Sequence, residues 1–296
     1  MPSLEAARSS NADYAPPSPP VAIFVGGTSG IGRAMAETLA RYTNGNVNII
    51  IIGRNRAAAE AIIASFPPPP AGVQHEFVPC DANLMKNVES TTQGLLARLP
   101  KVNYLVLSSA NLRFFGRGET SEGIDDLAVL MYYARWKFIH DLIPLLRKAK
   151  DAGEDAKVMS VAGPGLGNGI DLDDLGPKRN RGILNMRAQL SMYNDLMIEA
   201  FAERDPTMSF IHIWPGIVDT PILGRFFWFL FYFFSVSAEE CAEYMLCALF
   251  TAGPGAHRMD NHGDDMGKER HYGSDEASQR LWEFTEGEIA RAMNVA

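Results

Sequence analysis

Residues 21–32 read VAIFVGGTSGIG, an apolar run that passes directly into a glycine-rich turn. Apolar residues with helical spacing follow over Ile31–Tyr42. A strand that ends in glycines just before a helix suits a dinucleotide, because the backbone can approach a pyrophosphate and the helix N-terminus favours its charge. The spacing here is GxxxGxG rather than GxGxxG. Such a cluster also fits an ordinary strand-to-helix turn, but its place after the first strand of an alternating chain favours nucleotide binding.

Outward from this stretch, segments with strand and helix patterns alternate. We expect strands at Val21–Val25, Asn48–Ile52, Gln74–Val78, Tyr104–Leu107, Lys157–Val161 and Ser209–Trp214. We expect helices at Ile31–Tyr42, Asn55–Phe66, Leu84–Leu99, Leu127–Lys150, Ile183–Glu203, Ala238–Phe250 and Ser274–Met293, the last with Ser274 as N-cap. This order predicts an α/β fold of the Rossmann type, a doubly wound parallel sheet with helices on both faces, in a single domain.

The chain is expected to have three parts. Residues 1–20 are rich in Ser and Pro and lack the apolar core of a secretory signal, so they are expected to be disordered. Residues 21–252 are expected to form the nucleotide-binding and catalytic domain, with residues 221–236 as an aromatic lid. Residues 253–296 are expected to form a C-terminal extension, irregular over Gly253–Gly273 and helical after it.

Composition and charge exclude several classes of protein. A net charge of −8 argues against a nucleic-acid partner, which requires a clustered basic surface. Cys80, Cys241 and Cys247 form no CxxC pair, so we expect no disulfide framework and a cytoplasmic location. The histidines lack paired spacing and the acidic run at residues 171–174 lacks further ligands nearby, so no metal site is predicted.

The aromatic run Phe226–Phe234 reads FFWFLFYFF. It is too short to span a membrane, which takes ~20 apolar residues. Exposed to water it would be costly, since burial of one Phe side chain stabilises by ~1.5–3 kcal/mol. The run is therefore expected to cover a lipophilic substrate or a partner subunit, ahead of peripheral contact with a membrane surface.

Several motifs, taken together, resemble those of the short-chain dehydrogenase/reductase family. The glycine turn resembles TGxxxGIG, with Val25 in place of Thr, and residues 215–221, PGIVDTP, resemble PGxVxTP. Asp81-Ala82 follows the third expected strand, and residues 108–111, SSAN, stand where the family has NNAG. Ser160, in the stretch VMSVAG, falls where the family places its catalytic Ser. The resemblance covers roughly residues 21–250.

The resemblance implies a dinucleotide cofactor and the residues that hold it. The implied cofactor-binding residues are Gly26, Thr28, Ser29, Gly30, Ile31, Gly32, Arg54, Asp81, Ala82, Ser109, Ala110, Pro215, Gly216, Val218 and Thr220. An acid after the second strand would hold a ribose 2′-hydroxyl, but this chain has Arg54 and Arg56 there and Arg33 after the glycine turn. Guanidinium groups pair well with phosphate, so NADP(H) is favoured over NAD(H).

The family's Tyr and Lys, four residues apart on the helix after Ser160, are absent. Counting back from Pro215 places the missing pair near Gly182 and Met186, and Tyr193 lies too far along the helix. Candidate replacements are Asp171, Asp173, Asp174, Arg181, Asn185, Arg187, Tyr132, Tyr133 and Arg135. Each of them also suits a solvated loop, a core or an interface.

Three functions remain open from the sequence. The first is an NADP(H)-dependent oxidoreductase that acts on a hydrophobic carbonyl or alcohol with Ser160 and a non-standard proton donor. The second is a non-redox isomerase or cyclase, and the third is a nucleotide-binding pseudoenzyme, since the fold does not dictate the reaction. Many members of the family form homo-oligomers through their long helices, so a homo-oligomer is possible here.

Overall fold

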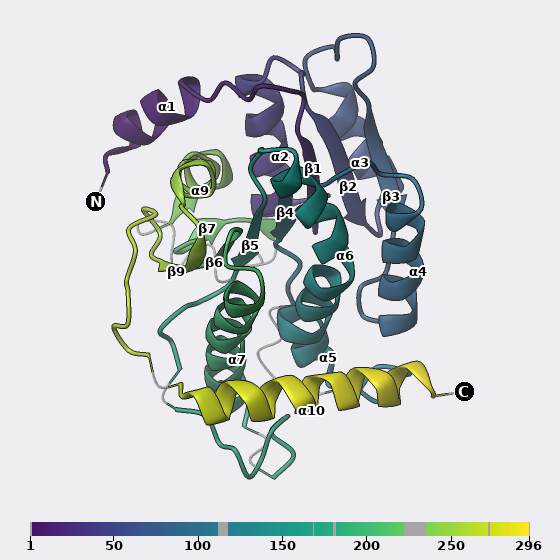
Figure 1. Ribbon diagram of the computed structural model, residues 1–296, viewed down its shortest axis with the longest axis vertical. Coiled ribbons are helices and arrows are strands. Elements are labelled where there is room, and N and C mark those ends of the chain that lie inside the picture. Colours follow the sequence, from purple (N-terminus) through teal and green to yellow (C-terminus); the bar gives the residue numbers. More distant parts are fainter. Residues whose placement is uncertain are drawn as a thin grey trace.

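Seven parallel strands form the central sheet of the computed structural model (Figure 1). The structure describes residues 2–111, 118–167, 169–179, 182–221, 235–271 and 273–295. The strand order is β3-β2-β1-β4-β5-β6-β9. The strands are β1 (Val21–Val25), β2 (Asn48–Gly53), β3 (His75–Pro79), β4 (Tyr104–Leu107), β5 (Lys157–Val161), β6 (Ser209–Ile213) and β9 (Gly255–Met259). This confirms the predicted doubly wound α/β fold.

Helices cover both faces of the sheet because successive side chains of a strand point to opposite faces. In β1, Ile23 packs on one side and Phe24 on the other. The first side carries α4 (Met85–Leu96), α6 (Ala134–Asp151) and α7 (Ile183–Arg204). The second carries α2 (Gly30–Tyr42), α3 (Arg56–Ala64) and α9 (Ala238–Thr251). A separate pair of short parallel strands, β7 (Val218–Asp219) and β8 (Val236–Ser237), flanks α9.

A π-helical turn interrupts the long helix predicted over Leu127–Lys150. The segment consists of α5 (Asp126–Ala128), the turn η1 (Val129–Tyr133) and α6. One side-chain bond accompanies the wider turn: Nε of Arg135 donates to the carbonyl of Leu130 at 3.1 Å. Such turns are frequent at functional sites, and two residues of this one line the cavity described below.

A helix forms within residues 2–20, a part of the segment for which the sequence predicted disorder. Helix α1 (Leu4–Ala12) is capped by Ser3 and packs against α9 (Figure 1). Nδ2 of the buried Asn11 donates to a carboxylate oxygen of Glu243 at 2.9 Å. The ring of Tyr14 stacks on Phe250 with centroids 3.9 Å apart. A few specific contacts therefore hold a segment whose composition is typical of disorder.

The C-terminal residues add a strand to the sheet. Strand β9 lies within the stretch Gly253–Gly273 that was expected to be irregular, and it pairs in parallel with β6. The residues after the boundary predicted at residue 252 thus contribute a strand to the same sheet as the residues before it. The sequence GAHRM lacks a strand-like apolar run, because the strand is at the sheet edge and its buried Arg258 pairs with Asp195.

The final helix, α10 (Asp275–Met293), covers the outer surface of the α4, α6 and α7 side (Figure 1). Its predicted N-cap is confirmed, since the Ser274 side chain accepts from the N–H of Ala277. The ring of Trp282 lies 4.9 Å from Trp136 of α6 and 5.0 Å from Phe201 of α7, centroid to centroid. This aromatic cluster joins α10 to both long helices.

We expect Glu243→Ala to lower the free energy of unfolding by about 1–3 kcal/mol, as is typical for lost bonds to a charged group. The buried carboxylate of Glu243 accepts from Asn11, from Tyr42 at 2.8 Å and from Arg41 at 2.8 Å. Urea denaturation measures the change. Glu239→Ala, on the same helix but exposed, is the control, and an equal loss in both variants would contradict this role of Glu243.

Candidate functional site

A cavity of about 660 Å³ opens at the carboxyl ends of the strands. Its walls come from residues that follow β1, β2, β3, β4, β5 and β6. Strand order reverses between β1 and β4, and ligands of open parallel sheets bind outside the carboxyl ends at such a reversal. The volume lies in the range of small-molecule sites.

Fourteen of the fifteen residues predicted to bind the cofactor line this cavity, and Gly32 is the exception. A Cβ on Gly32 would lie 2.3 Å from Oγ of Ser108, so this glycine lets α2 approach the end of β4. Gly26 has a φ of 90°, and a Cβ there would lie 2.6 Å from the backbone nitrogen of Ser109. The glycines therefore shape the floor of the cavity, and their contact with a nucleotide stays a prediction.

The N-terminus of α2 faces the cavity with its backbone N–H groups uncapped by a side chain. Ser29 is the N-cap residue, but its side chain makes no capping hydrogen bond, in contrast to Asn55 on α3 and Ser237 on α9. Ser29 and Gly30 both line the cavity. Helix N-termini of this kind bind phosphate through their free N–H groups and the helix dipole.

Arg54 is the one of the three predicted phosphate-binding arginines that lines the cavity. Arg33 instead bonds Glu37 at 2.8 Å, and Arg56 bonds Glu60 at 3.3 Å, each along its own helix. Asp81, after β3, also lines the cavity, and one of its oxygens accepts from both nitrogens of Asn83. Arg54 makes no ion pair with any residue that the structure describes.

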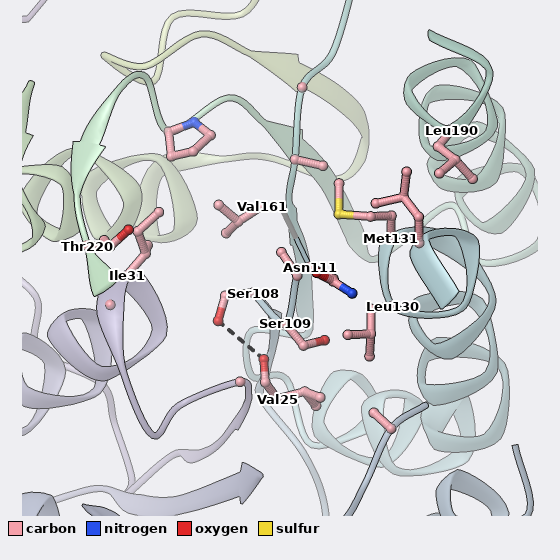
Figure 2. Close-up of a pocket in the computed structure, with 18 of the residues that line it drawn as sticks. Val25, Ile31, Ser108, Ser109, Asn111, Leu130, Met131, Val161, Leu190 and Thr220 are labelled. Atoms are coloured by element: carbon pink, nitrogen blue, oxygen red, sulfur yellow. Dashed lines mark hydrogen bonds between the residues drawn. The ribbon is translucent and has the colours of Figure 1, made fainter. Parts of the chain in front are cut away.

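The other end of the cavity is apolar. Figure 2 shows Ile31 and Thr220 on one side of it, and Leu130, Met131 and Leu190 on the opposite side. Within the described chain, the large apolar side chains that are exposed are Leu166 at 59%, Leu184 at 80% and Trp214 at 38%, and all of them line this cavity. The aromatic run Phe226–Phe234 lies outside the described residues, so its role as a lid stays a prediction.

Ser160 is in the core and does not line the cavity. Its side chain is 0% exposed, accepts from Nη1 of Arg135 at 2.7 Å and donates to Oδ1 of Asn194 at 2.8 Å. The expected contact between Ser160 and a substrate oxygen is therefore replaced by contacts within the core. The sequence context of Ser160 resembles the family, but the direction of its side chain depends on Arg135 and Asn194.

Arg135 is a buried cation bonded to neutral groups. Besides Ser160 it donates to the carbonyl oxygens of Leu130, Val161 and Ser109, at 3.1, 2.9 and 3.0 Å. Burial lowers the pKa of its guanidinium to about 9, which leaves it charged at neutral pH. Arg135 thus fixes the ends of β4 and β5 and the turn η1, three parts of the cavity wall.

A second buried polar group lies on the same face of the sheet. His212 of β6 is paired in register with Ser160, and its Nδ1 lies 2.6 Å from Oδ1 of Asp195. Nε of Arg258 lies 3.1 Å from the same carboxylate oxygen. Burial lowers the pKa of His212, and the charges of Arg135 and Arg258 act in the same direction against Asp195. His212 therefore supports the core as a neutral ring and does not line the cavity.

The residues of α7 that line the cavity differ from those obtained by counting back along the sequence from Pro215. Gly182 precedes the helix and Met186 is 0% exposed in the core, so neither of these two positions lines the cavity. Three pairs of residues four apart on α7 line the cavity instead, namely Leu184 and Ala188, Arg187 and Ser191, and Leu190 and Asn194. The described lining contains no tyrosine, lysine or histidine. No residue of these types in the described lining therefore takes the place of the family's Tyr and Lys.

The remaining candidates lie away from the cavity. Oδ1 of Asp174 accepts from the N–H groups of Lys178 and Arg179, which stabilises its own loop. The hydroxyl of Tyr132 bonds Thr285 of α10 at 2.8 Å. Asp171, Asp173, Asn185 and Tyr133 do not line the cavity, and Arg181 lies outside the described residues.

The described residues offer neither a metal site nor a membrane-spanning helix. They contain no group of three or more His, Cys, Asp or Glu side chains able to hold a metal ion. They also contain no helix with the length and hydropathy needed to cross a membrane.

Known proteins that this chain resembles include dehydrogenases, reductases and other oxidoreductases. The family model for short chain dehydrogenases matches residues 20–168. Oxidoreductase AN1596 of Emericella nidulans is 36% identical over 227 residues, which cover 77% of this chain and 67% of the relative. Short-chain dehydrogenase/reductase SAT2 of Stachybotrys chartarum is 29% identical over 75% of this chain and 67% of its own. An NADPH-bound carbonyl reductase from chicken fatty liver has a similar fold, with a TM-score of 0.63 and 16% identity over 84% of this chain and 99% of that one.

We expect Ser160→Ala to lower the free energy of unfolding by about 1–3 kcal/mol, because a buried guanidinium N–H and a buried amide oxygen each lose a partner. Urea denaturation measures this. The control is Ser209→Ala, a buried serine of β6 whose hydroxyl donates to carbonyl oxygens, and it should cost less. A catalytic hydroxyl would instead give slower turnover at unchanged stability, and that result would contradict the core role.

Proposed function

The chain belongs to the short-chain dehydrogenase/reductase family, whose members named above are oxidoreductases, and we propose that it uses NADP(H) to reduce a lipophilic carbonyl or oxidise the corresponding alcohol. The observation that carries the proposal is the cavity itself. It places a glycine turn, an open helix N-terminus and Arg54 at one end and an exposed apolar surface at the other.

The residues around β1, β2 and β3 fit a dinucleotide. The uncapped N–H groups of α2 suit the pyrophosphate, and Gly26 and Gly30, both with positive φ, bring the backbone to the cavity surface. The carboxylate of Asp81 keeps one oxygen beyond its bonds to Asn83, which suits an N–H donor such as an adenine amino group. When bound, the nicotinamide would supply or accept the hydride.

The preference for a 2′-phosphate rests on Arg54. No acidic side chain follows β2, where one would repel a phosphate, and Arg54 lines the cavity at that point. A guanidinium binds phosphate through charge-assisted hydrogen bonds. The carbonyl reductase of similar fold was solved with NADPH bound, which is in keeping with this proposal.

The preference for a lipophilic substrate rests on Leu166, Leu184 and Trp214. Exposed apolar side chains gathered in one concave surface mark a binding site for an apolar partner, because water contact with them is unfavourable. The residues that follow Pro221 in the chain include the aromatic run, which would extend such a surface if it forms the expected lid.

Arg54→Ala should weaken NADPH binding by about tenfold or more, since a hydrogen bond to a charged group contributes ~1.5–3 kcal/mol. NADH binding should change little, because NADH lacks the 2′-phosphate. Fluorescence titration of both reduced nucleotides measures this. Arg56→Ala is the matched control, since that arginine pairs with Glu60 outside the cavity, and equal losses of both nucleotides in Arg54→Ala would contradict the assignment.

Purified protein should consume NADPH in the presence of lipophilic aldehydes or ketones, followed by the loss of nucleotide absorbance. The same panel with NADH should react more slowly. NADPH binding without consumption across the panel would favour a nucleotide-binding pseudoenzyme. Substrate turnover that proceeds equally well without nucleotide would favour the isomerase or cyclase.

A further inference from the structure

Helix α7 presents one continuous face to the cavity. Leu184, Arg187, Ala188, Ser191 and Asn194 line it, at the three- and four-residue spacings that place side chains on one side of a helix. Asn194 is fixed, because its Nδ2 donates to the carbonyl oxygens of Met131 and Leu190 at 2.8 Å each. The hydroxyl of Ser191 donates to the carbonyl of Gly163. These bonds anchor α7 to the residues that follow β5 and to the turn η1.

Few charged side chains line the cavity. In the part of the lining that the structure describes, the charged side chains are Arg54, Asp81 and Arg187. Arg54 and Asp81 follow β2 and β3, whereas α7 packs beside β6. Four strand spacings of ~4.8 Å separate β2 from β6, which is about 19 Å. Arg187 therefore lies far from Arg54, at the end of the cavity that carries the apolar surface.

The surroundings of Arg187 combine a cation with apolar side chains. Leu184 is one turn before it on the same face, and Leu190 one turn after it. Arg187 is half-buried, and this burial lowers its pKa, so the charged form is partly desolvated. A desolvated cation gains most from an anion, and the planar guanidinium matches the two oxygens of a carboxylate.

We propose that Arg187 binds a carboxylate of the substrate, whose apolar part lies against Leu166, Leu184 and Trp214. The substrate class is then a lipophilic carboxylic acid. Arg187 acts as a specificity-determining residue and not as a proton donor, because a guanidinium stays protonated at neutral pH. The carboxylate site belongs to the same cavity as the nucleotide site, and its role in catalysis rests on the proposed function.

The test compares two probes of equal shape that differ in charge, decanoate and decanamide, by isothermal titration calorimetry. Wild-type protein should bind decanoate about tenfold or more tightly than decanamide, the gain expected for a charge-assisted bond. Arg187→Gln should remove this preference and leave decanamide binding unchanged, which also shows that the variant is folded. Arg187→Lys should keep part of the preference.

Two further variants serve as controls. Arg33→Gln neutralises an arginine outside the cavity and should keep the preference for decanoate. Leu184→Ala should weaken both probes, since it removes apolar surface common to both. A wild type that fails to bind decanoate or to prefer it, or an Arg187→Gln variant that keeps the preference, overturns the proposal.

Each titration is repeated with nucleotide-free and NADPH-saturated protein, so the two proposals can fail separately. A preference for decanoate that depends on Arg187 in a protein without affinity for NADPH would support the carboxylate site and contradict the NADP(H)-dependent function. NADPH binding together with equal binding of decanoate and decanamide would contradict the carboxylate site and leave the NADP(H)-dependent function supported.

Discussion

The buried guanidinium of Arg135 is the interaction on which the cavity depends. Its hydrogen bonds reach Ser109 after β4, Ser160 and Val161 in β5, and Leu130 in η1, so one side chain joins two strand ends and a π-helical turn. Bonds to neutral carbonyls and a hydroxyl compensate the desolvation of the cation only when all of them are made. The geometry of the apolar end therefore follows from the core beneath it.

The sequence could predict those features that depend on residues close together in the chain. The strand-turn-helix at residues 21–42 and the residues after each strand were placed correctly, because parallel strands bring all their carboxyl ends to one edge. The direction of the Ser160 side chain could not be predicted, because a serine at a strand end looks the same in sequence whether it faces a ligand or the core. Its direction is set by Arg135 and Asn194, 25 and 34 residues away.

Other differences between the predictions and the structure also arise from contacts between residues that are far apart in the sequence. The pairing of Asn11 with Glu243 spans 232 residues, and no local pattern reveals it. The facing positions of α7 could not be counted from Pro215, because an offset of one residue turns a helix by about 100° and exchanges a core position such as Met186 for a cavity position such as Arg187.

The position of α10 has a consequence for biosynthesis. Trp136 and Phe201 come from the middle of the chain, yet the ring that covers them, Trp282, belongs to residues that leave the ribosome after both. Until residues 275–293 emerge, the nascent polypeptide exposes an aromatic surface on α6 and α7. This half of the core is therefore completed only once residues 275–293 are available, and the rings exposed before then favour association with other chains.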